Sequence, residues 1–263
     1  MKKLFISLGL GLLLFNSMAM ATPSLTVDEI MRRYYEITYY AGDDMQAQIS
    51  MVITDGQGRT RERSFSMIRK DIANSGKQLY FVYFKKPSDI RKATFLVHKF
   101  IDREDDRWMY LPSLDLVKRI SASDGRTSFM GSHYLYEDLS GRNIAYDKYE
   151  LVDESDKFYH IKITPKEPNT VEFSTYDLWV DKKTFLFYKS EFYDKNGRLY
   201  RRGETLSQEV IQGYPTLTKV RVSDIMGGGH TIAEYSKIKY DNKLDDSLFS
   251  ERYLRMPQHK YFE

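Results

Sequence analysis

The sequence predicts a mainly β protein (α+β overall) in which antiparallel strands form one large curled sheet, a sandwich or a barrel. Short segments of alternating apolar and polar residues follow one another along the chain, separated by Gly, Asn and Asp turn signals. Nothing indicates an alternating βαβ chain. The mean hydropathy is −0.54, yet 14% of the residues are aromatic. Both values fit a sheet with one apolar and one wetted face.

The first expected element is an amphipathic helix. Thr26-x-x-Glu29 is a capping box, because the hydroxyl and the carboxylate can each satisfy a free backbone N–H. The helix is expected to end near Ala41-Gly42, where glycine can adopt the left-handed cap conformation. Its apolar face is formed at helical spacing by Val27, Ile30, Met31, Tyr34 and Thr38.

From residue 44 the period changes to two, and residues 45–54 alternate as in a half-buried strand. Strands are expected at 44–54, 60–70, 79–84, 93–100, 107–111, 116–121, 148–152, 158–164, 171–181, 185–194, 199–211, 217–223 and 231–240. Residues 55–58, 194–197 and 227–229 have the composition of hairpin turns. Short helical segments are expected at 132–139 and after Asp245-Asp246-Ser247, whose side chains suit a helix start.

The first 21 residues have the three parts of a secretory signal peptide. Lys2 and Lys3 give a positive start, residues 4–15 form an uncharged apolar run, and Ala19-Met20-Ala21 is a small-x-small cleavage site. The run is shorter than the ~20 residues that span a bilayer, which disfavours a retained anchor as the alternative. We therefore expect cleavage after Ala21 and a periplasmic protein.

The expected mature chain, residues 22–263, is nearly neutral and lacks cysteine. Removal of Lys2 and Lys3 lowers the formal charge from +3 to +1, so composition gives no indication of nucleic-acid binding. No apolar segment of the mature chain is long enough to cross a membrane, and disulfides and thiol chemistry are excluded. About 240 residues without a linker, charge block or internal repeat predict a single domain.

No motif indicates catalysis, a metal or a cofactor. There is no G-x-S-x-G elbow and no P-loop. The histidines form neither an H-x-H nor an H-E-x-x-H pair; they are His98, His133, His160, His230 and His259. We therefore expect a protein that is not an enzyme. The enzymatic alternative would use Asp105, Asp106 and His133.

Residues 102–106 (Asp-Arg-Glu-Asp-Asp) form an acidic cluster with two interpretations. The cluster resembles paired carboxylates or a Ca²⁺ site, but it lacks the alternate oxygen ligands, the glycine and the distal glutamate of an EF-hand loop. We interpret it as a solvated turn between two strands, with Arg103 and Arg107 offsetting its charge. Gly227-Gly228-Gly229 is likewise interpreted as a hairpin turn, because no helix start follows it.

Large apolar side chains are dense on three consecutive expected strands. An ordinary core explains any one of them. As a set they indicate that a long curled sheet, with few helices to cover it, encloses more apolar volume than its side chains fill. A lipid-binding cavity is therefore expected, lined by Phe81, Tyr83, Phe95, Val97, Trp108 and Tyr110.

Several segments resemble the outer-membrane lipoprotein-sorting protein family, relatives of the LolA/LolB carriers. The central stretch comprises Arg107-Trp108-Met109-Tyr110-Leu111-Pro112, Lys118-Arg119-Ile120, Ser128-Phe129-Met130-Gly131-Ser132 and Tyr136-Glu137-Asp138-Leu139. The tail comprises Tyr235-x-Lys237-Ile238, Leu244-Asp245-Asp246-Ser247-Leu248-Phe249 and Tyr253-Leu254. The similarity runs over most of residues 22–263.

The resemblance implies a half-barrel of about 11 strands, with a few short helices over a concave face that holds acyl chains. It also implies a cell-envelope role as a carrier or chaperone of a lipid or acylated protein, working with an RND-type (MMPL-like) inner-membrane exporter. Covalent chemistry is not needed for this role. The alternative is an accessory interaction protein of an envelope transport complex that binds no lipid.

Overall fold

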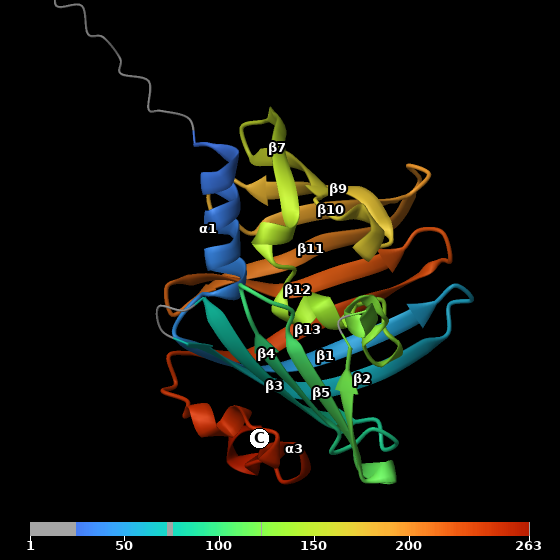
Figure 1. Cartoon of the computed structure of the whole chain (residues 1–263), viewed down its shortest axis with the longest axis vertical. Coiled ribbons are helices and arrows are strands. Elements are labelled where there is room, and N and C mark those ends of the chain that lie inside the picture. The colour runs from blue at the N-terminus through green and yellow to red at the C-terminus, as the bar shows by residue number, and fades with distance from the viewer. Residues whose placement is uncertain (1–24, 73–75, 122, 263) are drawn as a thin grey trace, which may run out of the picture.

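The computed structural model describes residues 25–72, 76–121 and 123–262, and within them thirteen antiparallel strands form one sheet (Figure 1). The strand order is β6-β5-β4-β3-β2-β1-β13-β12-β11-β10-β9-β8-β7, so β1 and β13 join two meanders. The strands are β1 Asp44–Asp55, β2 Thr60–Ile72, β3 Lys77–Lys86, β4 Thr94–Lys99, β5 Asp106–Leu111, β6 Leu116–Ile120, β7 Asp147–Glu154, β8 Phe158–Pro165, β9 Phe173–Asp181, β10 Phe187–Asp194, β11 Leu199–Ile211, β12 Tyr214–Asp224 and β13 Gly229–Tyr240.

The sheet is open and strongly curved. Its edge strands β6 and β7 do not pair with each other, and both ends of the sheet bend toward the side that carries the central helices (Figure 1). The predicted mainly β half-barrel is confirmed, with thirteen strands in place of about eleven. The predicted signal peptide, residues 1–21, lies outside the described residues.

Helix α1 (Val27–Tyr39) begins at the predicted capping box. The Thr26 hydroxyl accepts from the Glu29 backbone N–H at 3.3 Å, and the Glu29 carboxylate accepts from the Thr26 N–H at 2.8 Å. The helix ends at Tyr39 with Tyr40 as its C-cap, two residues before Gly42, whose φ is +67°. Its buried side chains, Ile30, Met31, Tyr34 and Tyr35, pack on an apolar core formed mainly by β8, β9 and β10.

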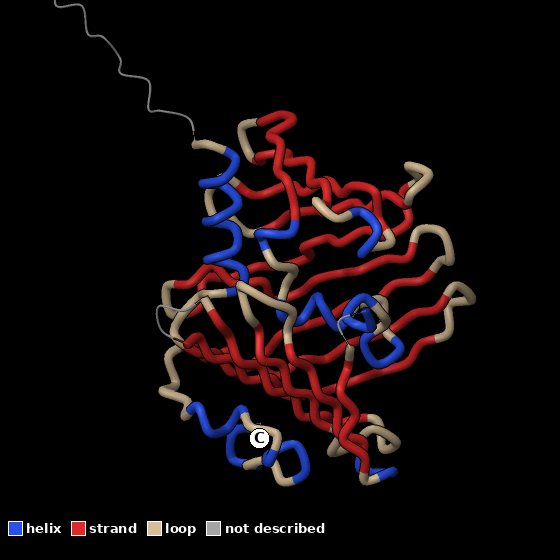
Figure 2. Tube along the Cα trace, in the orientation of Figure 1, coloured by secondary structure: helices blue, strands red, loops and turns tan. Residues whose placement is uncertain are grey.

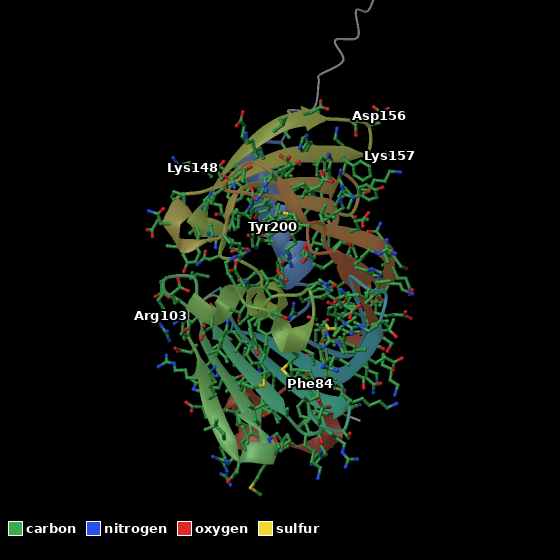
Figure 3. The ribbon with its side chains drawn as sticks, turned by 90° about the vertical axis from the view of Figure 1, so that its right-hand side faces the viewer. Phe84, Arg103, Lys148, Asp156, Lys157 and Tyr200 are labelled. Atoms are coloured by element: carbon green, nitrogen blue, oxygen red, sulfur yellow. The ribbon has the colours of Figure 1, made fainter. Side chains whose placement is uncertain are left out.

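A second core lies on the same, concave face over β1–β5. It is covered by the segment between β6 and β7, which consists of 3₁₀ turns and the short helix α2 (Tyr136–Ser140; Figure 2). Phe129 is the centre of this contact: its ring lies 5.9 Å from that of Phe65 and 5.8 Å from those of Phe84 and Phe95. In Figure 3, Phe84 lies in the lower half of the molecule, whereas Tyr200, which packs on the α1 core, lies in the upper half.

The C-terminal segment covers the opposite, convex face of β2–β5 and lies at the bottom of Figure 1. It contains the 3₁₀ turn Asp246–Phe249 and helix α3 (Arg252–Arg255), and Asp245 caps the turn as its composition predicts. Side chains of the sheet donate to its backbone carbonyls. Thr94 donates to Leu254 at 2.7 Å and Ser66 to Phe262 at 2.9 Å. The C-terminal segment is therefore held on the convex face of these strands by both apolar packing and hydrogen bonds.

The predicted hairpin turns are confirmed. Residues 225–228 join β12 to β13, and the Asp224 carboxylate accepts from the Met226 and Gly227 N–H groups at 3.0 and 2.8 Å. Gly229 has φ +93°, and a Cβ there would lie 2.5 Å from the Thr54 carbonyl oxygen. Only glycine fits this close approach of two hairpins.

The acidic cluster at 102–106 forms the expected turn, but its second half is not solvated. The Asp105 side chain is 10% exposed and pairs with the buried Arg107 at 2.8 Å. Its other oxygen accepts from the Phe100 N–H at 3.1 Å. The prediction of a solvated turn is therefore wrong for Asp105 and Arg107, because α2 and its neighbours cover this end of the sheet.

Candidate functional site

A half-open cavity of about 250 Å³ lies between the concave face of the sheet, α1 and the α2 segment. Its wall draws on both apolar cores, so it lies where they meet. Most of the side chains that line it come from α1 (Tyr34, Tyr35, Ile37, Thr38, Tyr39), the α2 segment (Arg126, Tyr134, Glu137, Asp138, Leu139, Arg142), β1–β3 (Met45, Ala47, Ile49, Met51, Phe65, Met67, Arg69, Tyr80) and β9–β13 (Tyr176, Leu178, Phe187, Ser190, Phe192, Arg201, Pro215, Leu217, Val220, Val222, Tyr235, Ile238, Tyr240).

Most of the wall is apolar. Strands β1, β2, β12 and β13 contribute Ile, Leu, Val, Met and Ala side chains that alternate with outward-facing polar residues. Leu217 and Ile238 are only half buried, so they keep apolar surface that a ligand could cover. Burying such surface is favourable by about 25 cal/mol per Å². The cavity can therefore bind hydrocarbon.

A network of charges closes the α2 side of the cavity. Arg126 pairs with Glu137 at 3.2 Å and with Glu172 at 2.6 Å. Arg142 pairs with the buried Asp147 at 2.9 Å, and Arg201 of β11 pairs with Asp138. These pairs tie the α2 segment to β7, to Glu172 directly before β9, and to β11. Each arginine that lines the cavity is thus compensated by carboxylates.

Tyrosine hydroxyls supply the other polar groups. Burial raises the pKa of Tyr34 and of Tyr235 to about 12, and the nearby Asp138 carboxylate adds to both shifts. Burial likewise raises the pKa of Tyr39 and Tyr176 well above the usual value. These phenols remain protonated at neutral pH and can donate hydrogen bonds.

Buried polar side chains of the sheet hold the C-terminal ends of both covering helices. The guanidinium of Arg69 donates to the carbonyl of Tyr39, the last residue of α1, and to those of Ala41 (2.5 Å) and Gly42 (2.8 Å) just beyond it. Lys99 donates to the Ser140 carbonyl at the end of α2, at 2.5 Å. Cations at helix C-termini satisfy free carbonyls and complement the helix dipole. Both helices are therefore fixed to the sheet at one end of the cavity.

The structure divides the six predicted lipid-binding residues between two faces. Phe95 and Val97 belong to the concave core, whereas the other four pack under the C-terminal segment on the convex face. Phe81 and Tyr83, for example, lie 5.4 and 5.5 Å from the Phe262 ring, centroid to centroid. The cavity wall contains none of the six: Phe81, Tyr83, Phe95, Val97, Trp108 and Tyr110. A role for them in lipid binding stays a prediction.

Sequence reasoning missed the side chains that do line the cavity on α1 and the α2 segment. A signal was present, because α1 carries Tyr34, Tyr35 and Tyr39 at helical spacing, more hydroxyls than a dry core accommodates without partners. Residues of the second half of the sheet gave no such signal, since they alternate like any half-buried strand.

The residues of the enzymatic alternative have separate partners. Asp105 and Asp106 are paired with arginines, and His133 contacts the Thr231 hydroxyl of β13 at 2.8 Å. Among the described residues, no group of three or more His, Asp or Glu side chains could hold a metal ion.

None of the helices within the described part of the chain has the length and apolar character that crossing a membrane requires.

Comparison with known proteins identifies the family. Residues 76–256 match the model of a family described as "-like: Uncharacterized protein". No curated protein matches the chain. A DUF1329 family protein from Desulfovibrio piger ATCC 29098 is 30% identical, with a TM-score of 0.79 over 86% of this chain and 96% of that chain.

Two further solved structures share the fold. A putative outer membrane lipoprotein-sorting protein domain from Vibrio parahaemolyticus is 23% identical, with a TM-score of 0.79 over 86% of this chain and 97% of that one. A LolA superfamily protein from Nitrosomonas europaea is 21% identical, with a TM-score of 0.68 over 88% of this chain and 100% of that one. The chain therefore belongs to the DUF1329 family and has the LolA-like fold that its sequence resemblance predicted.

Proposed function

We propose that this protein is a periplasmic carrier or chaperone that shelters the acyl chains of a lipid or lipidated protein in the cavity between the sheet, α1 and α2. The observation that carries the proposal is the half-open, largely apolar cavity of about 250 Å³ on the concave face. The fold shared with a lipoprotein-sorting domain supports it. No covalent step is involved.

The physical need for such a carrier is clear. Each CH₂ group exposed to water costs about 0.8 kcal/mol, so an acyl chain crosses an aqueous compartment only inside an apolar shelter. Half-buried wall residues such as Leu217 and Ile238 gain contacts when a chain enters. The proposal also includes secretion through the predicted signal peptide (residues 1–21), a single domain at residues 22–263, and cooperation with an RND/MMPL-type exporter.

Filling the cavity is expected to weaken acyl binding. Leu217→Trp places a larger side chain against the half-buried part of the wall, and we expect at least a tenfold loss of affinity for a fluorescent probe that is a fatty-acid methyl ester, about 1.4 kcal/mol. The measurement is a fluorescence titration of the purified protein. Mass spectrometry of organic extracts of the wild type would identify any lipid carried from the cell.

The matched control is Leu206→Trp. Leu206 lies on the neighbouring strand β11, is 41% exposed and does not line the cavity. The Leu206→Trp variant should bind the probe like the wild type. Wild-type protein that is always extracted empty and ignores the probe would contradict the carrier proposal and favour an accessory interaction protein that binds no lipid.

A further inference from the structure

Eight buried side-chain polar atoms of the described residues have no hydrogen-bond partner, and four of them belong to residues of the cavity wall: Thr38, Arg69, Glu137 and Arg201. The Thr38 hydroxyl on α1 and Nε of Arg201 on β11 are buried without a hydrogen-bond partner. Tyr235 on β13 lines the same cavity; its hydroxyl is not one of these buried unpartnered atoms, and it makes no hydrogen bond to another described residue. Unpartnered buried polar groups are costly, and native proteins contain few of them.

Most of these free groups are hydrogen-bond donors. Nε of a guanidinium can only donate. A protonated phenol and a threonine hydroxyl can donate when an acceptor arrives, and the Thr38 hydroxyl can turn toward the cavity by rotation about χ1. The one free acceptor, Oε1 of Glu137, lies 3.6 Å from Nη1 of Arg142, so this cation already faces it. The wall is therefore prepared for an acceptor atom of a ligand.

The charges around these donors decide whether that acceptor is ionised. The three arginines of the α2 network face four carboxylates, those of Glu137, Asp138, Glu172 and Asp147. Arg69, the fourth arginine of the wall, lies 3.6 Å from the Asp71 carboxylate and donates to three backbone carbonyls. Among the described residues of the wall, each arginine therefore already has a carboxylate partner. Burying a carboxylate or phosphate beside these groups would leave its charge uncompensated, which is strongly unfavourable.

We propose that the cavity selects uncharged acyl esters or amides, whose carbonyl oxygen accepts from Tyr235, Thr38 and Arg201 while the hydrocarbon covers the apolar wall. The inference rests on the proposed carrier function and specifies its ligand class. Free fatty acids and phosphate-bearing lipids without a neutral linkage near the donors are poor ligands. The acyl chains of a lipidated protein, joined through ester and amide groups, fit this site.

Competition between ligands with the same chain tests the proposal. The uncharged dye 1-N-phenylnaphthylamine is bound to the purified protein and displaced by methyl laurate, lauramide, lauric acid, dodecyl phosphate or dodecane. We expect the ester and the amide to displace the dye at about tenfold lower concentration than the other three. Tenfold corresponds to 1.4 kcal/mol, as expected for one additional hydrogen bond.

Variants that lack a single hydroxyl group test which residues produce the preference for esters and amides. Tyr235→Phe and Thr38→Val should each weaken methyl laurate about three- to tenfold and leave dodecane unchanged. Tyr188→Phe, at a half-exposed tyrosine away from the cavity, should bind like the wild type. Preferred binding of lauric acid or dodecyl phosphate, or equal losses for methyl laurate and dodecane, would overturn the inference while leaving a carrier. Failure of every compound to displace the dye would overturn both proposals.

Discussion

Arg69→Met is expected to lower the free energy of unfolding by about 3–5 kcal/mol, the range seen when one partner of a buried charged network is removed. The Arg69 side chain is 4% exposed, and its guanidinium donates to three backbone carbonyls, those of Tyr39, Ala41 and Gly42. Methionine leaves these acceptors buried without partners. Denaturant unfolding at neutral pH measures the change.

Two further variants test whether the loss of stability comes from the hydrogen bonds of Arg69 or from the removal of any arginine. Arg61→Met removes an exposed arginine of the same strand and should change stability by less than about 0.5 kcal/mol. Arg69→Lys keeps the charge but not the planar fork, so an intermediate loss is expected. Because Arg69 holds the end of α1, amide exchange in the last turn of that helix should also accelerate. Equal stability of Arg69→Met and Arg61→Met would contradict this assignment.

The local elements of the fold could be predicted from the sequence because short-range chemistry determines them. The capping box at Thr26 and Glu29 forms the hydrogen bonds that its spacing requires, and the glycines at 227–229 form the expected turn. Each predicted strand segment corresponds to an observed strand. The count of about eleven strands came from the resemblance and is lower than the thirteen observed.

The faces of the strands could not be predicted, because register depends on pairing between distant segments. Phe81 pairs with Leu96 and both point to the convex face, while the adjacent pair Val82 and Phe95 points to the concave face. A dense apolar strand such as β3 carries large side chains on both faces, so composition does not show which face covers a cavity.

The polar part of the site depends on tertiary contacts for the same reason. Arg201 and Asp138 are 63 residues apart in the sequence, and nothing in either segment indicates that they pair. The C-terminal segment was expected to contain a helical turn, but its docking on the convex face follows from donors such as Thr94 and Ser66 on distant strands. These contacts decide which apolar residues remain for a ligand.

The second large effect concerns Lys99 and pH. The side chain is buried (3% exposed), and burial lowers its pKa from 10.5 to about 8. Between these two pH values the unfolded chain binds more protons at this site than the folded chain, so stability rises with pH. The gain contributed by Lys99 from pH 7 to pH 9.5 is about 2 kcal/mol, at 1.36 kcal/mol per pKa unit.

Lys99→Met is expected to remove this rise, because methionine has no proton to lose. The measurement is the free energy of unfolding of wild type and variant at several pH values from 7 to 9.5, below the range in which the buried tyrosines titrate. Lys157→Met, at the exposed turn between β7 and β8 (Figure 3), is the matched control and should keep the wild-type slope. Parallel curves for wild type and Lys99→Met would show that this lysine stays protonated where it binds the end of α2, and the slope would then have to come from other groups.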